Sequence, residues 1–474
     1  MAKALKTLLL NLPYGSRLVR RYMCSYQSPN ILFPPLELLA LGGIVREKKS
    51  GDLLCFDAVA QRLDLSATAA RVREFEPDLI VTLTGFGSFP EDADSIRAVR
   101  KACPDGTLAV IGHYPTVFPR EILEHLPVDC VIRGEPDTAF SEVYDRVAAR
   151  ESLDGITGIA YRARDGTITV CGEPERLTDI GSLPRPAYEA LDLRPYSEPF
   201  LPRPYAGLQT ARGCPYGCRF CVRSYGTPMA AQSPQRILED VRFLYEKLGI
   251  RGLRFTDDTF TAVPERTMQT CRLLIESGMR IRWSCLSRCD RLNDDMLGLM
   301  KKAGCRSVYL GIESGCQRIL DYYGKGITVE QARAAVRACR RHGIITVGFF
   351  VIGAPDETRD EFEQTLDFLS TSGLDVFSGD VLVVYPGTAL HEKLKDEVEF
   401  SLFPYRNRFR DEDLEERQYR WKKESYRRFY CRPGYLPEKA ALWAKHPREA
   451  FAGFSRLLGF FGRRKPEHKG AEAL

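Results

Sequence analysis

No stretch of this chain approaches the roughly 20 consecutive apolar residues that a membrane-spanning helix requires. The N-terminal segment MAKALKTLLLNLPYG has only a short apolar run, from Leu8 to Leu10, and lacks a small-residue cleavage site after it, so it does not predict a signal peptide. A net charge of +5 over 474 residues is too small an excess to indicate a nucleic-acid-binding surface. These absences favour a cytoplasmic protein that does not bind nucleic acid.

The length is too great for one ordinary hydrophobic core and predicts two or three domains. A composition with 44% hydrophobic and 28% charged residues is typical of globular proteins. Fifteen cysteines in a reducing compartment predict buried thiols or metal ligands and not disulfides.

Residues 1–148 alternate between apolar strand-like runs and helical patterns. The strand-like runs are LKTLLLNLP, DLLCFDA, PDLIVTLTG, TLAVIGH and VDCVIRGE. This alternation predicts an α/β fold with a parallel sheet covered by helices on both faces, in a Rossmann-like domain of the flavodoxin type. Ligands of such sheets bind beyond the carboxyl ends of the strands.

Residues 149–200 predict a hairpin that turns at Asp165–Gly166, followed by a Pro-rich linker. Residues 201–395 contain six strand–helix units, which predict a partial (β/α)6 barrel of the TIM type with its active site at the carboxyl ends of the strands. Helix-start signals stand at Ser233, Thr328 and Thr358. Strand signals stop beyond 396, so residues 396–474 are expected to be helical.

Three cysteines lie within GCPYGCRFC, directly after the first expected barrel strand: Cys214, Cys218 and Cys221. Closely spaced thiolates suit zinc or iron–sulfur ligation. A structural zinc site normally uses four protein ligands in two hooks, and the sequence offers no second Cys-x-x-Cys hook. The spacing therefore favours a four-iron cluster with one iron open to another ligand, with a zinc site and a chance group of cysteines as alternatives.

CPYGCRFC resembles the Cys-x3-Cys-x2-Cys signature of radical S-adenosylmethionine (SAM) enzymes. Further motifs over about 200–395 support the resemblance, namely FTDDTFT, RWSCLSRCDRL, KKAGCRSVYLGIESG, GFFVIGAPDET and VVYPGT. It implies that the three cysteines hold a [4Fe-4S] cluster whose open iron binds the amino nitrogen and carboxylate of SAM. An electron then cleaves SAM to methionine and a 5′-deoxyadenosyl radical, with a flavodoxin or ferredoxin as the expected electron donor.

The same resemblance implies a set of SAM-binding residues. Phe220 flanks the adenine, Asp257 or Asp258 meets the amino group, and Glu313 accepts a ribose hydroxyl. Ser287 and Arg288 end the third strand, where an arginine can bind the SAM carboxylate. The segment from Val351 through Gly353 to Ala354 passes under the adenine.

The N-terminal region, through FPPLELLALGGIVREK, LLCFDAV, VIGHYPTVFP and VIRGEPDTAF, resembles the cobalamin-binding domain of B12-dependent radical SAM enzymes. Val59 stands where the cobalt-binding histidine of Asp-x-His-x-x-Gly would be, which implies cobalamin without a protein histidine ligand. His113 replaces the second glycine of a Gly-Gly pair. The residues implied to face cobalamin are Thr82, Thr84, Gly85, Gly112, Gly134 and Glu135. A degenerate domain that binds no cofactor is the alternative.

RRFYCRPGYL resembles the tail of the anaerobic cyclase-like and hopanoid-associated branch of the superfamily. The following AFAGFSRLLGFFGRRK either lies on a membrane surface or packs over the open side of the barrel, and we favour packing. Membrane association would suit a lipid or tetrapyrrole substrate.

We therefore predict a cobalamin-dependent radical SAM enzyme that methylates an unactivated carbon of a small molecule. One alternative is oxidative cyclisation or ring rearrangement without methyl transfer, and a second is a non-catalytic iron–sulfur protein that binds a partner. A methylthiotransferase would carry three further cluster cysteines and an RNA-binding domain. No acid, base or radical relay is assigned, and Tyr309, Asp380 and Tyr385 are interpreted as structural.

Overall fold

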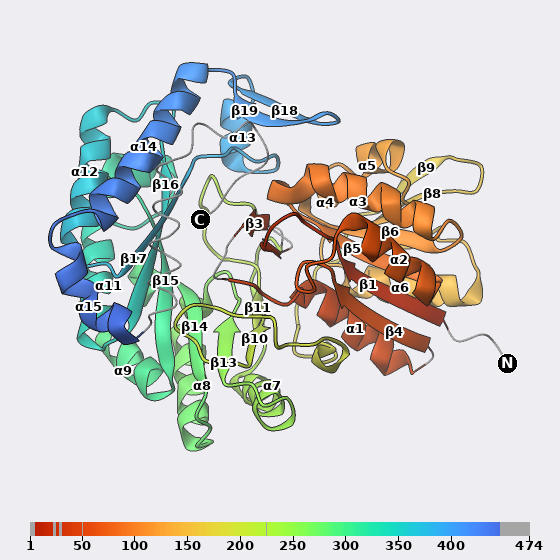
Figure 1. Ribbon diagram of the computed structural model, residues 1–474, viewed down its shortest axis with the longest axis horizontal. Coiled ribbons are helices and arrows are strands. Elements are labelled where there is room, and N and C mark those ends of the chain that lie inside the picture. The colour runs from red at the N-terminus through yellow and green to blue at the C-terminus, as the bar shows by residue number, and fades with distance from the viewer. Residues whose placement is uncertain (1–4, 22–24, 28–30, 50, 224, 446–474) are drawn as a thin grey trace.

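The protein is described by a computed structural model that covers residues 5–21, 25–27, 31–49, 51–223 and 225–445 (Figure 1). Two sheets dominate it, one of seven strands and one of six. Three short pairs complete the strands: β2 (Leu18–Arg20) with β3 (Ser25–Gln27), β11 (Ala211–Arg212) with β12 (Ala230–Ala231), and β18 (Val398–Leu402) with β19 (Tyr405–Phe409). Among the described helices, none is both long and apolar enough to cross a membrane.

The first sheet has the order β4-β1-β5-β6-β7-β8-β9. Its strands are β1 (Leu5–Asn11), β4 (Gly51–Asp57), β5 (Leu79–Thr84), β6 (Thr107–Gly112), β7 (Cys130–Ile132), β8 (Ile159–Arg162) and β9 (Ile168–Cys171). The strands from β4 to β7 are parallel, and their order in chain sequence is 2-1-3-4-5. This is the flavodoxin-type order, which the sequence predicted.

Helices cover both faces of the first sheet: α1 (Leu36–Lys48), α2 (Leu65–Phe75), α3 (Phe89–Ala102), α4 (His113–Val117), α5 (Pro119–His125) and α6 (Asp137–Ala149). Successive residues of β1 therefore enter different cores. Leu9 packs in one hydrophobic cluster, while Leu8 and Leu10 pack in another on the opposite face. Burial on both faces explains why the strand reads as a continuous apolar run.

The hairpin predicted at Asp165–Gly166 forms as β8 and β9, but it does not belong to a linker. β8 pairs antiparallel with β7, so the hairpin extends the first sheet. The first sheet thus ends at Cys171, beyond the boundary expected at residue 148. Sequence alternation identified the hairpin but could not reveal its pairing partner, because pairing is a long-range property.

The second sheet has its strands in chain order: β10 (Tyr205–Leu208), β13 (Gly252–Phe255), β14 (Arg282–Arg288), β15 (Cys305–Glu313), β16 (Ile345–Ile352) and β17 (Val376–Val381). Every neighbouring pair is parallel, and the sheet stays open between β10 and β17. The six predicted strands are therefore confirmed, as is the open side.

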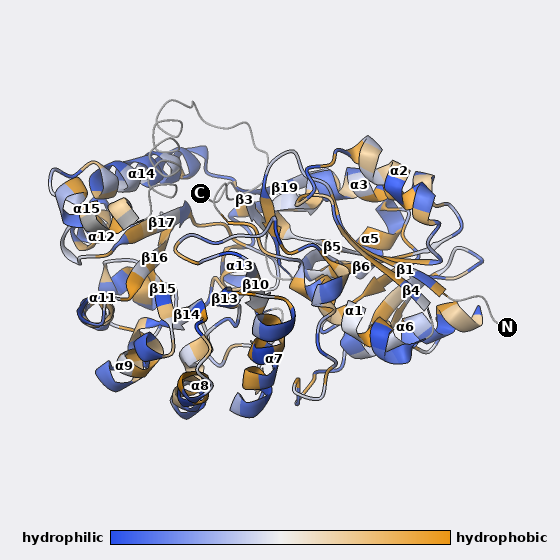
Figure 2. Cartoon of the chain, turned by 60° about the horizontal axis from the view of Figure 1, so that its bottom comes forward, coloured by the Kyte–Doolittle hydropathy of each residue, from blue (hydrophilic) through white to orange (hydrophobic). Residues whose placement is uncertain are grey.

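Helices follow one another along the outer side of this sheet (Figures 1 and 2). They are α7 (Pro234–Lys247), α8 (Pro264–Glu276), α9 (Asp294–Lys302), α11 (Val329–Arg341) and α12 (Arg359–Thr371), with the short α10 (Gln317–Tyr322) after β15. Ser233, Thr328 and Thr358 cap α7, α11 and α12 with their side chains, as predicted. At Thr328 and Thr358 the reciprocal capping box is complete.

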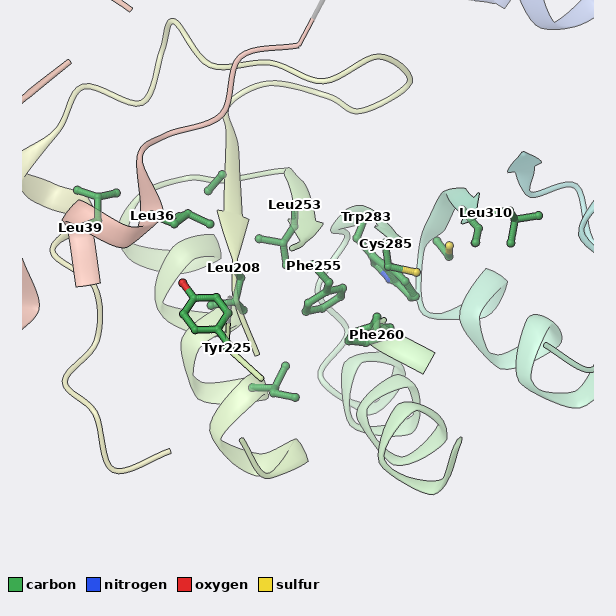
Figure 3. Packing of buried hydrophobic residues seen from close by; sticks show 14 of the residues in the cluster. Leu36, Leu39, Leu208, Tyr225, Leu253, Phe255, Phe260, Trp283, Cys285 and Leu310 are labelled. Carbon is green, nitrogen blue, oxygen red and sulfur yellow. The ribbon is translucent and has the colours of Figure 1, made fainter. Parts of the chain in front are cut away.

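The two sheets share one hydrophobic core. Figure 3 shows Leu36 and Leu39 of α1 beside Leu208 and Leu253 of the second sheet. A Cβ atom added to Gly207 would lie 2.8 Å from Leu36 Cδ1, so the first domain packs directly on β10. The Tyr188 hydroxyl, from the Pro-rich segment, donates to the Gly207 carbonyl at 2.8 Å within this contact.

The C-terminal region is not entirely helical, contrary to prediction. The β18–β19 hairpin follows α13 (Ala389–Leu394) and packs on the first domain through aromatic rings. Phe403 lies 5.6 Å from Phe89 between ring centroids, and the Tyr405 and Tyr114 hydroxyls are 3.1 Å apart. The sequence FSLFPYRNRF is short and half polar, which is why the pattern did not indicate strands. The amphipathic segment around 451–465 lies outside the described residues.

Helix α14 (Glu412–Tyr430) covers the open edge at β17, and α15 (Tyr435–Lys445) follows it. The Tyr430 hydroxyl accepts from the Phe377 N–H at 3.2 Å and donates to the Phe377 carbonyl at 2.7 Å. Tyr426 does the same at Gly379, at 3.1 and 3.2 Å. Tyr426 and Tyr430 thereby hydrogen-bond the backbone groups of the edge strand β17. Without such partners, the exposed backbone of an edge strand can pair with another chain.

Replacing Tyr430 with Phe is expected to lower the free energy of unfolding by about 1–3 kcal/mol, because two backbone groups lose their partner in a buried setting. Urea unfolding measures this loss. Tyr419→Phe on the same helix is the control, since no hydrogen bond of its hydroxyl is found in the described part of the chain. Equal stability of the two variants would contradict the role assigned to Tyr430.

Candidate functional site

The three clustered cysteines lie on a loop between β11 and β12, which follows β10 at the carboxyl edge of the second sheet. Residues 213–228, of which 224 is not described, are called the cysteine loop. Its three thiols are partly exposed, whereas the other described cysteines are buried apart from Cys171 and Cys431. Exposure at the active edge of the sheet distinguishes these three from thiols that only fill the core.

Two cations lie against these thiols. The Arg288 guanidinium approaches Cys218 Sγ to 3.9 Å and stacks on the Tyr216 ring at 3.9 Å. Burial raises the pKa of the Cys218 thiol, and the nearby Lys325 ammonium and Arg288 guanidinium oppose that rise. Positive charge of this kind favours the thiolate form that binds iron.

Within the described residues, no group of three His, Cys, Asp or Glu side chains is gathered closely enough to hold a single metal ion. A [4Fe-4S] cluster makes a different demand, because each cysteine binds a separate iron. Three partly exposed thiolates on one loop, with cations beside them, have the donor chemistry of such a cluster.

Lys325 is held by Glu313, the residue predicted to end the fourth strand of the barrel. Lys325 Nζ lies 2.7 Å from Glu313 Oε1, and both side chains are about nine-tenths buried. A Cβ atom at Gly311 would lie 2.6 Å from Lys325 Nζ and 2.7 Å from Glu313 Oε1, so a larger residue there would force the ends of this pair to shift. Glu313 also has a positive φ of 68°, a conformation that costs energy in a non-glycine residue.

The two consecutive aspartates differ in their surroundings. Asp257 accepts bonds from Thr210 N and Oγ1 at 2.5 and 2.6 Å and from Ala211 N at 2.9 Å, so it fixes the turn after β10. Asp258 is partly exposed and is an electrostatic neighbour of Cys221. Desolvation raises the pKa of Asp258 to about 6, and Arg21 of the first domain opposes this rise.

The residues predicted to meet adenine come together. Phe220 and Val351 pack against one hydrophobic cluster, and the Tyr323 ring meets Phe220 edge-on at 5.3 Å. Gly353 has a φ of 82°, and its N–H donates to Glu357 Oε2 at 3.1 Å, as does that of Ala354. The strand end after β16 is thereby fixed by Glu357.

The hydroxyl of Ser287, a predicted SAM-binding residue, is already hydrogen-bonded within the protein. This hydroxyl lies 2.6 Å from the Thr261 hydroxyl and donates to the Arg288 carbonyl at 3.1 Å. It therefore orders the end of β14 and supports Arg288 from behind.

A buried polar network fills part of the carboxyl edge of the first sheet. The Arg20 guanidinium donates to Asp92 at 2.6 Å and to Asn11 at 2.9 Å, and Asp57 accepts from Asn11 and from Tyr196. Arg20 and Asp92 are both fully buried. Asn11 and Asp57, which end β1 and β4, thus belong to one hydrogen-bonded unit with Arg20, Asp92 and Tyr196.

The residues predicted to face cobalamin divide into two groups. Thr84 Oγ1 is buried and has no hydrogen-bond partner among the described residues, and a Cβ atom at Gly112 would lie 2.3 Å from the Thr84 carbonyl oxygen. Thr82, in contrast, donates to the Leu10 carbonyl at 2.9 Å, and Glu135 pairs with arginines beside the cysteine loop. The Thr84 hydroxyl is therefore open to a ligand at this edge, whereas Gly112 is required by the close approach of the Thr84 backbone. The side chains of Thr82 and Glu135 are engaged within the protein.

The two remaining residues predicted to face cobalamin are glycines whose N–H groups donate hydrogen bonds within the protein. Gly85 N donates weakly to Asp92 at 3.4 Å, and Gly134, with a φ of 59°, donates to the Thr116 hydroxyl at 3.0 Å.

Val59 and His113 are both buried between the two domains. Val59 packs with Leu18 and Phe33 in an apolar cluster. His113 Nε2 lies 3.2 Å from the Pro386 carbonyl oxygen, and desolvation lowers the pKa of His113 to about 4. A neutral imidazole at this position is an interdomain contact.

Three residues that the sequence interpreted as structural have structural contacts. Tyr309 lies under the Arg254 guanidinium at 3.9 Å, Asp380 pairs with Lys422 at 2.8 Å, and Tyr385 stacks on Phe86 at 4.2 Å. Sequence reasoning missed Lys325, whose only signal is its place between two glycines, and Arg212, which immediately precedes the cysteine motif.

Comparisons with known proteins identify relatives of this chain. Residues 208–369 match the model of the radical SAM superfamily. An uncharacterized methyltransferase of Pyrococcus horikoshii is 34% identical over 365 residues, which cover 76% of this chain and 78% of that protein. The anaerobic magnesium-protoporphyrin IX monomethyl ester cyclase of Cereibacter sphaeroides is 23% identical over 77% of this chain, but the chain spans only 61% of its length.

Solved structures share the fold. The radical SAM methyltransferase TsrM of Kitasatospora setae, solved with cobalamin and a [4Fe-4S] cluster, superposes with a TM-score of 0.67 at 18% identity, over 83% of this chain and 75% of that chain. The cobalamin-dependent SAM radical enzyme OxsB, with aqua-cobalamin, superposes with a TM-score of 0.69 at 17% identity, over 88% and 66%. Both matches extend across the two sheets.

Lys325→Met is expected to destabilise the metal-free chain by about 3–5 kcal/mol, because it leaves the Glu313 carboxylate buried without its cation. The double variant Lys325→Met/Glu313→Gln should recover most of that loss, since it removes the unpaired charge. Urea unfolding of the four forms in a double-mutant cycle measures the coupling. If the double variant lost as much stability as the two single variants together, Lys325 and Glu313 would not be energetically coupled.

Glu357 predicts a pH dependence of stability. Burial raises its pKa from 4.5 to about 7. Between these values the folded chain retains a proton that the unfolded chain has lost, so stability falls as the pH rises from 4.5 to 7, by up to about 3 kcal/mol. Urea unfolding across this range should show a flatter profile for Glu357→Gln, whereas Asp360→Asn, an exposed position in the first turn of the following helix α12, should follow the wild type. Parallel profiles for wild type and Glu357→Gln would refute the assignment.

Proposed function

Because the chain belongs to the radical SAM superfamily, we propose that it is a cobalamin-dependent enzyme that cleaves SAM and transfers a methyl group to an unactivated carbon of a small molecule. The observation that carries the proposal is the cysteine loop at the carboxyl edge of the second sheet. Cys214, Cys218 and Cys221 lie there between the cations Arg288 and Lys325 and the carboxylate of Asp258. The cysteine loop is thus beside charged groups of both signs, which suit the amino and carboxylate groups of SAM.

Each residue has a role in this proposal. The three cysteines hold a [4Fe-4S] cluster, which supplies the electron that cleaves the SAM sulfonium. Asp258, and not Asp257, receives the SAM amino group, because the Asp257 carboxylate is taken up by Thr210 and Ala211.

Arg288 is suited to the SAM carboxylate because its guanidinium is already oriented by Asp290 at 3.0 Å and the Lys325 carbonyl at 2.8 Å. Glu313, fixed by Lys325, lies on the ribose side. Phe220, Val351 and Gly353 form the apolar wall for adenine, with Ser287 supporting the strand end behind Arg288.

Cobalamin is proposed to lie against the carboxyl edge of the first sheet. Thr84, Gly85, Gly112 and Gly134 are the contacts that remain after Thr82 and Glu135 are set aside, because those two side chains have partners within the protein. Val59, in its apolar cluster, offers no lower ligand to cobalt. We propose that the first domain reaches to Cys171, so that it includes the β8–β9 hairpin.

Methyl transfer is favoured because relatives that align along most of this chain are named as methyltransferases, including the Pyrococcus protein. Oxidative cyclisation is the second candidate, since the Cereibacter cyclase aligns over a similar share of the chain. The substrate is a small molecule, with a lipid or tetrapyrrole as candidates, and the electron donor is a flavodoxin or ferredoxin. For the segment around 451–465, packing over the barrel was favoured and membrane contact was the alternative, and this segment lies outside the described residues.

The test is anaerobic reconstitution with iron and sulfide, with and without hydroxocobalamin, followed by reduction in the presence of SAM. The expected result is 5′-deoxyadenosine together with bound corrinoid, and loss of the nucleoside product in Cys218→Ala. 5′-Deoxyadenosine without bound corrinoid would remove cobalamin and methyl transfer from the proposal. A fully loaded cluster that yields no SAM cleavage would overturn it entirely and favour a non-catalytic iron–sulfur protein.

A further inference from the structure

Charged residues of the first domain reach across to the cysteine loop. Arg212, the last residue of β11, immediately precedes Gly213 and Cys214. Its guanidinium donates to Asp137 at 2.5 and 3.2 Å and to Glu135 at 3.4 Å. The arginine side chain is 6% exposed and both acids are 2% exposed, so the contact is shielded from water.

Arg176, from the segment between β9 and β10, holds the other end of the loop. Its Nε lies 3.3 Å from Glu135 Oε1, and its terminal nitrogen donates to the Pro228 carbonyl at 2.7 Å. A Cβ atom at Gly226 would lie 2.7 Å from Arg176, and one at Gly213 would lie 3.2 Å from it. Glu135 therefore connects the arginine before the loop to the arginine packed against both of its ends.

The loop has few bonds of its own. Within the loop, Cys214 N donates to the Gly226 carbonyl at 3.3 Å, Cys221 N donates to the Cys218 carbonyl at 3.3 Å, and Gly226 N donates to the Arg223 carbonyl at 2.8 Å. The two bonds that the cysteine N–H groups donate are long. The middle of the loop is tied to the barrel, because Arg219 N donates to the Tyr323 carbonyl and Leu390 N donates to the Arg219 carbonyl, both at 2.8 Å. The two ends of the loop depend on the contacts of Arg176 and Arg212.

We infer that Glu135, Asp137, Arg176 and Arg212 form a clamp through which the first domain positions the cysteine loop for iron binding. These are positioning residues, because none of them contacts the cysteine sulfurs in the structure. The inference rests on the proposed function only in assigning a cluster to this loop. It implies that cluster retention depends on the first domain as well as on the barrel.

The matched control is a second buried pair that is remote from the loop. Glu198 accepts from Arg254 at 3.0 Å, with side-chain exposures of 0% and 5%. Glu198→Gln therefore removes a comparable buried carboxylate without touching the clamp. Arg176→Gln is a milder clamp variant, because Arg176 is 31% exposed and its loss leaves Arg212 paired with Asp137.

The experiment compares Glu135→Gln, Asp137→Asn, Arg176→Gln and Glu198→Gln in the full chain. Hydrogen exchange of residues 213–228 is measured in the metal-free protein, and the rate of iron loss to a chelator is measured after reconstitution. The clamp variants should exchange loop amides about tenfold faster than the wild type, because local opening of the loop becomes easier. They should also lose iron faster and show an altered EPR spectrum of the reduced cluster, whereas Glu198→Gln should change neither.

Loop exchange and iron loss that match the Glu198→Gln control at equal melting temperature would overturn the clamp. If Glu135→Gln does not fold, Arg176→Gln and Asp137→Asn decide the question. A wild-type chain that binds no cluster would defeat the proposed function but not this measurement, since hydrogen exchange needs no metal. Faster loop exchange in the clamp variants would then still support the positioning role.

Discussion

The three partly exposed cysteines lie on a loop with few internal hydrogen bonds, so their geometry depends on groups outside the loop, both backbone groups of the barrel and charged side chains. Arg212, Arg288 and Lys325 supply those charges, and each is buried against an acidic partner. Burying an ion pair costs desolvation energy that an apolar pair would not, so such pairs are weak devices for stability. Their concentration around one loop is better explained by the need to fix its orientation, and Arg212 links the loop to the first domain.

The sequence predicted the parallel strands of both sheets well because they are buried on two faces. In that setting each strand is a short apolar run and each helix is amphipathic, so local pattern and fold agree. Leu8, Leu9 and Leu10 illustrate this, since neighbouring residues serve opposite cores. The three cysteines were predictable for the same reason, because their spacing is a local property.

Features that depend on distant partners escaped prediction. Glu135 follows a strand end where a ligand contact was expected, yet its partner is an arginine 77 positions away. Lys325 carries no pattern beyond its flanking glycines, and only the approach of Glu313 reveals it. The β18–β19 hairpin was missed because its stabilisation comes from rings of the first domain, such as Phe89 and Tyr114, and not from its own alternation.

The two aspartates after β13 show how far local reasoning extends. Asp257 and Asp258 follow the end of β13, and their carboxylates have different surroundings. Asp257 turns toward Thr210 and becomes part of the scaffold, while Asp258 turns toward Cys221 and Arg21. The sequence alone could restrict the predicted SAM-binding carboxylate to this pair, and the contacts of Asp257 with Thr210 and Ala211 favour Asp258. A carboxylate engaged by the scaffold and one left open to a ligand can thus be neighbours in the chain, because each is turned by its own contacts.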